Sequence, residues 1–325
     1  MIHWNTNRII NNMKVLFFCQ DYLGIHNIIE KGIVEYTGYE VKKILFSEYK
    51  YKNNFEKFLN FASKLVLKKN LKKKWASEFY ANQVATNEHF DFIFIISPDY
   101  LLNKELEYVT SKAKKSIVYF WDSFKLIGRY ERTLPFFDVK FSFEPSDVEK
   151  YNMQLLTNFY FDSVSSNKIT TDAYYIGNFD NRILIIEKIV SLLVENDLKP
   201  EVLIKIKSNK KTEIYSKDIK FITEFVPFEE NQKRIKETKI ILDIHKQVQN
   251  GLTFRVFEAI GLNKKLITTN KDIINYDFYN PNNIFIWDEN TKEIPKDFLN
   301  KEYEKLPENI YQKYSLENWV KTILQ

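Results

Sequence analysis

Glycine, cysteine and histidine are scarce in this chain of 325 residues, and each shortage excludes a class of site. The 7 Gly include no GxGxxG and no GxxxxGK[ST] spacing, so the dinucleotide fingerprint and the P-loop are absent. The one cysteine, Cys19, cannot form an internal disulfide, which fits a reducing cytoplasm. The 4 His are scattered and leave little for a zinc site. The absence of the two glycine patterns counts against a nicotinamide dehydrogenase and an ATPase.

Long apolar runs and paired aspartates are also missing. No run approaches the ~18 consecutive apolar residues of a membrane span. Residues 1–12 are polar and lack the apolar core of a signal peptide, and Met13 opens a typical first strand. We therefore expect residues 1–12 to be an extension or a misassigned start. No two Asp stand two apart, so there is no Asp-x-Asp metal clamp, and we expect neither a metal nor a cofactor.

Positive charge is concentrated in one segment, Lys64–Lys74, within a net charge of +5. This bias indicates an anionic partner. Phe55, Phe58 and Leu65 belong to an apolar stripe at helical spacing that leads into the lysines. Two interpretations are open: a helix lying on an anionic membrane, and a core-packing helix with a solvated basic end. We favour core packing for the stripe and membrane contact for the lysines. Because no nucleic-acid-binding signature accompanies the basic residues, we expect no nucleic-acid partner.

The first half of the chain alternates between apolar strand-like runs and helical patterns. The expected strands are residues 14–20, 39–46, 90–97, 115–121 and 139–143. The expected helices are residues 25–36, a long one at 53–87, 101–112 and a short one from 144. The near-continuous apolar run at 90–97 is typical of a strand buried on both faces of a parallel sheet.

The same alternation restarts in the second half. Strands are expected at 173–178, 201–207, 220–225, 239–244, 264–269 and 283–287, and helices at 181–195, 228–238, 252–261 and 299–325. Two such arrays predict an α/β protein of two Rossmann-like doubly wound domains facing a cleft. We place the domains at 1–165 and 166–325, with the last helix packing back on the N-terminal domain.

The stretch "NGLTFRVFEAIGLNKKLIT" (250–268) contains a turn followed by a helix. Thr253 and Arg255 stand at the start of that helix. The start of a helix offers unpaired N–H groups and a positive dipole end, which together favour a phosphate. Gly251 allows close approach of the backbone, and Arg255 adds a planar fork suited to phosphate oxygens. Glu258, one turn later, can accept hydrogen bonds from ribose hydroxyls. The alternative is a capped amphipathic helix with a surface Arg–Glu pair.

This stretch resembles the C-terminal nucleotide-binding segment of GT-B glycosyltransferases, most closely bacterial proteins of capsule and lipopolysaccharide (surface polysaccharide) biosynthesis. Further matching stretches are "FWDSFKLIGRYERTLPFFDVKFSFEPSDVEKY" (120–151), "YYIGNFDNR" (174–182) and "NYDFYNPNNIFI" (275–286). The resemblance covers most of the chain from residue 14. It implies the GT-B fold and a C-terminal domain that binds the nucleotide-sugar donor, itself a substrate.

The resemblance also assigns roles at the helix start. Thr253 and Arg255 would contact the diphosphate, and Glu258 the ribose. The sequence departs from the better-known retaining pattern, which carries a pair of Glu, because positions 250 and 266 hold Asn250 and Leu266. Stereochemistry therefore stays open.

The remaining donor-side candidates lie at strand ends and in loops. A basic residue often meets the donor phosphates in GT-B enzymes, so Lys205 or Lys207 is a candidate, with a solvated strand end as the alternative. Arg182 either contacts phosphate or pairs at the surface, and His245 is either a ligand contact or a structural histidine. The donor-binding candidates are Gly177, Arg182, Lys205, Lys207, His245, Gln249, Asn250, Gly251, Leu252, Thr253, Arg255 and Glu258.

A base that accepts the acceptor's hydroxyl proton is expected from the first domain. Asp21 and His26 follow its first strand, and Asp122 follows another strand. None is preferred: Asp122 can equally be a helix N-cap, and Asp21 and His26 loop residues without a catalytic role.

The sequence thus predicts a metal-independent, cytoplasmic glycosyltransferase that joins a sugar to a hydroxyl of a surface-polysaccharide or lipid-linked glycan. Peripheral contact with the inner face of the plasma membrane is part of this prediction. Two alternatives remain: a sugar-nucleotide epimerase on the same scaffold, and a non-catalytic nucleotide-binding subunit of a polysaccharide assembly complex.

Overall fold

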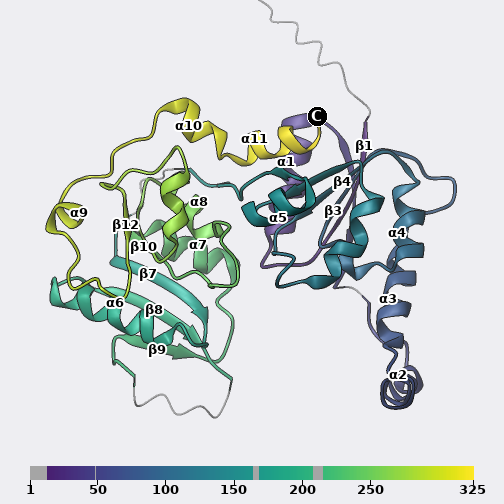
Figure 1. Ribbon diagram of the computed structural model, residues 1–325, viewed down its shortest axis with the longest axis horizontal. Coiled ribbons are helices and arrows are strands. Elements are labelled where there is room, and N and C mark those ends of the chain that lie inside the picture. Colours follow the sequence, from purple (N-terminus) through teal and green to yellow (C-terminus); the bar gives the residue numbers. More distant parts are fainter. Residues whose placement is uncertain (1–12, 48, 164–167, 208–214) are drawn as a thin grey trace, which may run out of the picture. The chain divides into compact units, whose positions relative to one another are not determined.

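The computed structural model describes residues 13–47, 49–163, 168–207 and 215–325 (Figure 1). The chain forms two compact units. The first unit ends at Leu156 and takes in Val320–Gln325, and the second is Thr157–Trp319. The division comes about nine residues before the predicted boundary between residues 165 and 166. The expectation about residues 1–12 lies outside the described residues.

The first unit is built on a parallel sheet in which every neighbouring pair of strands is parallel. Its strands follow the order β2 (Glu40–Leu45), β1 (Lys14–Cys19), β3 (Phe90–Ile96), β4 (Ala113–Phe120), β5 (Val139–Ser142), β6 (Gln154–Leu155). The strands β1 and β3 are apolar throughout their centres, which buries both of their faces, as is typical of parallel sheets. The first strands confirm the sequence pattern, and the two-residue β6 was not predicted.

Helices connect these strands. They are α1 (Ile25–Thr37), α2 (Asn54–Val66), α3 (Leu71–Ala81), α4 (Asn103–Thr110), α5 (Pro145–Tyr151) and the short 3-10 helices η1 (Pro98–Tyr100) and η2 (Gly128–Phe136). Leu16 and Phe18 of β1 pack in one core with Tyr80 of α3 and Leu106 of α4. Phe17, which points to the opposite face, stacks on Phe94 of β3 at 5.2 Å.

The single long helix predicted over 53–87 is wrong. The chain breaks between α2 and α3, where Lys68 takes a left-handed conformation with φ of 52°. Asn70 then caps α3 by accepting a hydrogen bond from the Lys73 N–H. The apolar stripe of α2 was expected to pack in the core, and its residues Phe55 and Phe58 are exposed instead.

The second unit is also a parallel sheet. Its strands follow the order β12 (Ile284–Ile286), β11 (Lys265–Thr268), β10 (Thr238–Asp243), β7 (Thr171–Asn178), β8 (Pro200–Lys205), β9 (Ile219–Ile222). With strands numbered from the start of the unit, this is the 3-2-1-4-5-6 order of dinucleotide-binding Rossmann domains.

Two separate cores show that this second sheet has helices on both faces. Tyr175 of β7 packs with Ile186 of α6 (Ile183–Glu195), while its neighbour Tyr174 packs with Ile235 and Phe257. Those two belong to α7 (Phe228–Lys236) and α8 (Phe254–Gly261). The remaining helices are η3 (Lys271–Asn275), α9 (Lys296–Asn300), α10 (Glu308–Lys313) and α11 (Leu316–Ile323). The predicted α/β class with two Rossmann-like, doubly wound domains is confirmed.

Gly261, the last residue of α8, lies against the chain that enters the second unit. A Cβ atom there would lie 2.5 Å from the carbonyl oxygen of Asp162 and 2.6 Å from the Cβ of Tyr160. We expect Gly261→Ala to lower the free energy of unfolding by about 1–3 kcal/mol, because backbone must move. Urea denaturation measures this. Gly128→Ala is the control, since a Cβ there meets nothing within 4 Å, and an equal loss in both variants would contradict the prediction.

Candidate functional site

The winding of the second sheet reverses between β7 and β10 (Figure 1). Open α/β sheets bind ligands outside the carboxyl ends of the strands at such a reversal. Here the carboxyl ends are Asn178 of β7 and Asp243 of β10, and helix α8 begins at this same edge. The donor-binding residues expected from the sequence therefore gather where the topology predicts a ligand.

Asp243 fixes the start of α8. Its side chain is fully buried, and its two carboxylate oxygens accept hydrogen bonds from the hydroxyls of Thr253 and Thr268, each at 2.8 Å. Thr253 is the N-cap residue of α8, yet its side chain makes no capping hydrogen bond. The expected hydroxyl contact of Thr253 with phosphate is therefore not supported, because the proton of the hydroxyl is already given to Asp243. A phosphate would instead meet the N–H groups at the helix start.

Arg255 lies across this edge of the sheet. Its Nη2 donates to the carbonyl of Ile176 at 2.5 Å, and its guanidinium lies over the Tyr175 ring at 5.1 Å. Both partners belong to β7, so Arg255 links α8 to the strand at which the winding reverses. Neither of these two partners is a carboxylate, so these contacts do not offset the charge that the guanidinium offers to an anion.

Tyr175 is a functional candidate that the sequence analysis missed. Its side chain is 1% exposed, and its hydroxyl has no hydrogen-bond partner within the described parts of the chain. A Cβ at Gly177 would lie 2.6 Å from this hydroxyl, so glycine is required for the tyrosine to extend along the strand toward its carboxyl end. A buried hydroxyl without a partner costs free energy, which a ligand oxygen can recover. A Tyr two residues before a Gly at a strand end could have signalled this arrangement.

Arg182 pairs with a neighbouring carboxylate, in line with one of its two predicted alternatives. It forms a bidentate ion pair with Asp180, with Nη2 2.7 Å from the carboxylate, and its Nη1 donates to the Ile244 carbonyl at 2.6 Å. Its guanidinium therefore ties the loop after β7 to the end of β10, and its contact with phosphate stays a prediction. This bond braces the edge on which Arg255 and Tyr175 lie.

His245 follows β10 at the same edge. Its Nδ1 lies 2.8 Å from the Thr269 hydroxyl, which also accepts from the backbone N–H of His245 at 3.0 Å. The two contacts to Thr269 hold the imidazole ring at the edge of the sheet. Burial lowers the pKa of His245, which favours the neutral ring.

The loop before α8 is anchored through its backbone carbonyls. The Asn250 carbonyl accepts from Asn270 at 2.8 Å, and the Leu252 carbonyl accepts from Asn158 at 2.9 Å. The Leu252 side chain is buried in the core on the α8 face, and the assignment of Leu252 as a donor contact stays a prediction. Gln249 is half-buried and Gly251 buried. The loop is thereby held in place from two sides.

Glu258 faces helix α7. Its Oε1 accepts a hydrogen bond of 2.8 Å from Gln232, a buried residue that the sequence analysis did not single out. Burial raises the pKa of Glu258, while the Gln232 hydrogen bond and Arg255 act in the opposite direction. The ribose assignment of Glu258 stays a prediction.

The two lysine candidates lie beside this edge. Lys205 is the last residue of β8, and its ammonium lies over the exposed ring of Phe225. Lys207 follows beyond the strand and is exposed. Of the two, Lys205 is on the strand adjacent to β7 and is the better placed for a phosphate.

The first unit has its own winding reversal, between β1 and β3. His26 lies in the first turn of α1 after β1 and is buried, with Nδ1 3.3 Å from the carboxylate of Asp21. Burial is the main cause that lowers the pKa of His26, and Lys43 adds to it. After β3, the buried Ser97 takes a left-handed φ of 60°, a strained conformation of the kind found at functional sites.

Asp122 belongs to the same edge. It follows β4, is half-buried, and begins no helix, so the N-cap alternative is wrong within the described chain. Its neighbour Trp121 contacts Tyr22 edge to face at 5.8 Å. The structure thereby brings the loop of Asp21 close to the loop of Asp122.

Two neutral histidines predict how stability depends on pH. The folded pKa values of His26 and His245 lie below the unfolded value of 6.5. The unfolded state therefore binds more protons as pH falls through about 6.5, and stability drops there. We expect the free energy of unfolding from urea titrations to fall between pH 7.5 and 5.5. The pKa of Glu258 is raised in the folded state, so this residue adds stability as pH falls.

The control for this pH effect is the double variant His26→Gln/His245→Gln. It should lose less stability over the same pH interval than the wild type. An equal loss in both proteins would contradict the assignment of two neutral histidines.

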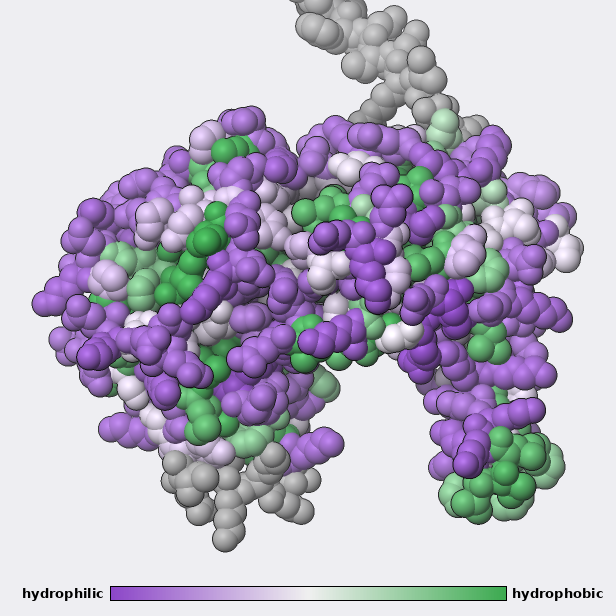
Figure 2. All heavy atoms as spheres, viewed as in Figure 1, coloured by the Kyte–Doolittle hydropathy of each residue, from purple (hydrophilic) through white to green (hydrophobic). Residues whose placement is uncertain are grey.

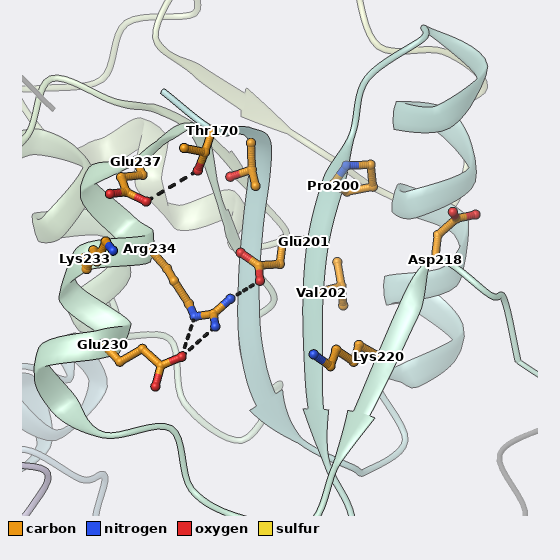
Figure 3. A pocket seen from close by; sticks show the side chains of 11 residues that line it. Thr170, Pro200, Glu201, Val202, Asp218, Lys220, Glu230, Lys233, Arg234 and Glu237 are labelled. Atoms are coloured by element: carbon orange, nitrogen blue, oxygen red, sulfur yellow. Dashed lines mark hydrogen bonds and ion pairs between the residues drawn. The ribbon is translucent and has the colours of Figure 1, made fainter. Parts of the chain in front are cut away.

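The cavity of about 460 Å³ drawn in Figure 3 lies at the amino ends of the strands of the second sheet, opposite the edge described above. Arg234 pairs there with Glu230, at 2.6 Å, and with Glu201. Since Arg234 is already paired with two carboxylates and the cavity lies at the opposite end of the strands from the start of α8, we assign the cavity a structural role.

Comparison with solved structures shows the same fold. The N-terminal domain of trehalose-6-phosphate phosphatase from Candida albicans has 11% identity and a TM-score of 0.56, over 97% of this chain and 96% of that one. MnaA of S. aureus with UDP has 9% identity and a TM-score of 0.52, over 96% and 95%. An α-glucosyltransferase with UDP and a 13-mer DNA has 12% identity and a TM-score of 0.50, over 96% and 95%. No protein-family model and no curated protein sequence matches the chain. The likeness shows the GT-B fold.

Proposed function

We propose that this protein is a glycosyltransferase that uses a nucleotide-sugar donor. The observation that carries the proposal is the arrangement at the carboxyl edge of β7 and β10. Arg255, the start of α8 and the buried, unpartnered hydroxyl of Tyr175 meet there. A diphosphate supplies oxygens for all three, and the topology favours a ligand at this edge.

These residues would stabilise the leaving group. When the bond between the anomeric carbon and the phosphate oxygen breaks, the electron pair stays on the nucleoside diphosphate. The dipole of α8, Arg255 and the Tyr175 hydroxyl would stabilise that added negative charge, with Lys205 as a further cation. In this proposal no metal is needed for departure of the diphosphate.

His26 is the proposed base. As the acceptor oxygen bonds to the anomeric carbon, its proton would pass to the neutral ring of His26. The carboxylate of Asp21, 3.3 Å from Nδ1, would stabilise the charged form of the ring. The lowered pKa keeps the ring unprotonated near neutral pH, as a base requires. Asp122 remains the alternative base.

The proposed acceptor is a surface-polysaccharide or lipid-linked glycan, as in capsule and lipopolysaccharide synthesis. A uridine nucleotide is the first donor to test, because two similar structures were solved with UDP. The protein would act in the cytoplasm, with the lysine-rich segment Lys64–Lys74 meeting anionic lipids at the inner face of the membrane.

A transfer assay tests this proposal. The protein is incubated with labelled nucleotide sugars and a membrane extract that contains lipid-linked glycans, and products are separated by mass. Transfer of label to a glycan, lost in His26→Ala, is the expected result. Isomerisation of the donor without an acceptor would indicate an epimerase, and nucleotide binding with no conversion would indicate a non-catalytic subunit.

A further inference from the structure

Helix α2 has its polar face turned toward the protein. On a helix with 3.6 residues per turn, Glu56, Asn60 and Ser63 share one face. Asn60 and Ser63 are buried, and Glu56 is partly buried. This is the reverse of a surface helix in a globular protein, whose apolar stripe normally faces the core.

The inward polar residues are held by hydrogen bonds. Asn60 donates to the Tyr51 hydroxyl at 2.8 Å and accepts from the Lys72 N–H at 2.9 Å. Ser63 donates to the Lys69 carbonyl at 3.1 Å, and Glu56 accepts from the Lys52 N–H at 2.9 Å. The orientation of α2 is thus specified by the segments on either side of it, including the first turn of α3.

The apolar face is left outward. Its residues, 61–75% exposed, are Phe55, Phe58, Phe61, Leu65, Val66 and the following Leu67. Figure 2 shows hydrophobic residues gathered on the surface where Figure 1 draws α2. A continuous group of large apolar side chains on a surface marks an interaction site. Among the described residues, no helix is both long enough and apolar enough to cross a bilayer.

Exposed lysines border this face. Lys57 and Lys64 lie at one side of the apolar arc, and the connection to α3 adds further lysines. The exposed lysines of the region are Lys57, Lys64, Lys68, Lys69, Lys72 and Lys74. Glu56, the one acidic residue of α2, faces inward. The partner therefore meets apolar side chains and positive charge together.

We propose that α2 lies in the surface of an anionic lipid bilayer, with its phenylalanines and Leu65 between the acyl chains and its lysines at the headgroups. Apolar insertion combined with a basic border is the chemistry of interfacial helices. The apolar face offers no hydrogen-bonding side chain to specify a protein partner. This inference deepens the membrane contact proposed above, but it does not depend on glycosyl transfer, because binding is measured without a sugar nucleotide.

Vesicle sedimentation of the full chain tests the apolar face. The wild type should bind vesicles that contain phosphatidylglycerol and not vesicles of phosphatidylcholine alone. Phe58→Ser/Leu65→Ser should weaken binding on the order of tenfold or more, since two large apolar groups are lost. The matched control, Leu184→Ser/Val194→Ser, alters two exposed apolar residues of α6 and should bind as the wild type does.

The lysines are tested separately. Lys64→Gln/Lys68→Gln/Lys69→Gln should reduce binding to the anionic vesicles roughly 10- to 100-fold, whereas Lys217→Gln/Lys292→Gln/Lys296→Gln should not. Absence of wild-type binding, or equal binding by the wild type and the Phe58/Leu65 variant, would overturn the proposal. A wild type that sediments as a dimer without lipid, beside a monomeric Phe58/Leu65 variant, would assign this face to a second copy and also overturn it.

Discussion

Arg255→Ala should raise the dissociation constant for the nucleoside diphosphate about 100-fold and lower kcat/KM about 10²–10³-fold. The guanidinium is the charged group fixed on β7 at the winding reversal, through the Ile176 carbonyl and the Tyr175 ring. Its removal deletes charge-assisted hydrogen bonds to phosphate and leaves the helix dipole to act alone. Isothermal titration with the nucleotide measures the first effect, and initial rates of transfer measure the second.

Two further variants sharpen this experiment. Arg255→Lys keeps the charge but not the planar fork, so its affinity should lie between those of wild type and Arg255→Ala. Lys220→Ala removes an exposed cation from β9, toward the opposite edge of the same sheet, and should leave affinity unchanged. Wild-type affinity in Arg255→Ala would show that the phosphates bind elsewhere.

Asp243→Ala should lower the free energy of unfolding by about 2–4 kcal/mol. The substitution removes an acceptor that is fully buried and leaves the hydroxyls of Thr253 and Thr268 without their partner. Urea denaturation measures the loss. Because Thr253 begins α8, the same substitution should also weaken nucleotide binding by loosening the helix start.

Asp297→Ala is the matched control, since this carboxylate is 83% exposed and pairs with Lys301 four residues on. The free energy of unfolding of Asp297→Ala should lie within about 0.5 kcal/mol of the wild-type value. If Asp243→Ala cost no more than the control, the buried threonine–aspartate arrangement would not be what holds α8 in place.

The fold was predictable because the repeating strand and helix patterns are long and strongly periodic. The apolar run of β3 and the restart at β7 led to two parallel sheets, and parallel strands bring their carboxyl ends to one edge. The location of Arg255 followed from the same logic, since its helix comes directly after β10.

The partners of single side chains were less predictable. Spacing indicates which element carries Arg182 or Thr253, but not that Asp180 and Asp243 bind them. These contacts depend on rotamers chosen by packing. Tyr175 was missed because its role depends on the close approach of its hydroxyl to Gly177.

Helix α2 shows a second limit of periodicity. A repeating apolar pattern identifies a face, but it does not say whether protein covers that face. Here the hydrogen bonds of Asn60 and Ser63 decide the orientation, and both partners lie in flanking turns. No pattern within α2 contains that information.

Thermal unfolding of the wild type with UDP, GDP, CMP, ADP or dTDP tests most directly whether the edge of β7 and β10 binds a sugar donor's nucleotide. A ligand at roughly 100 times its dissociation constant adds about 2.7 kcal/mol of stability, which is readily detected. We expect one of these nucleotides to raise Tm and the others to have little effect. No rise with any of them at millimolar concentration would contradict a nucleotide site, and the proposed glycosyltransferase activity with it.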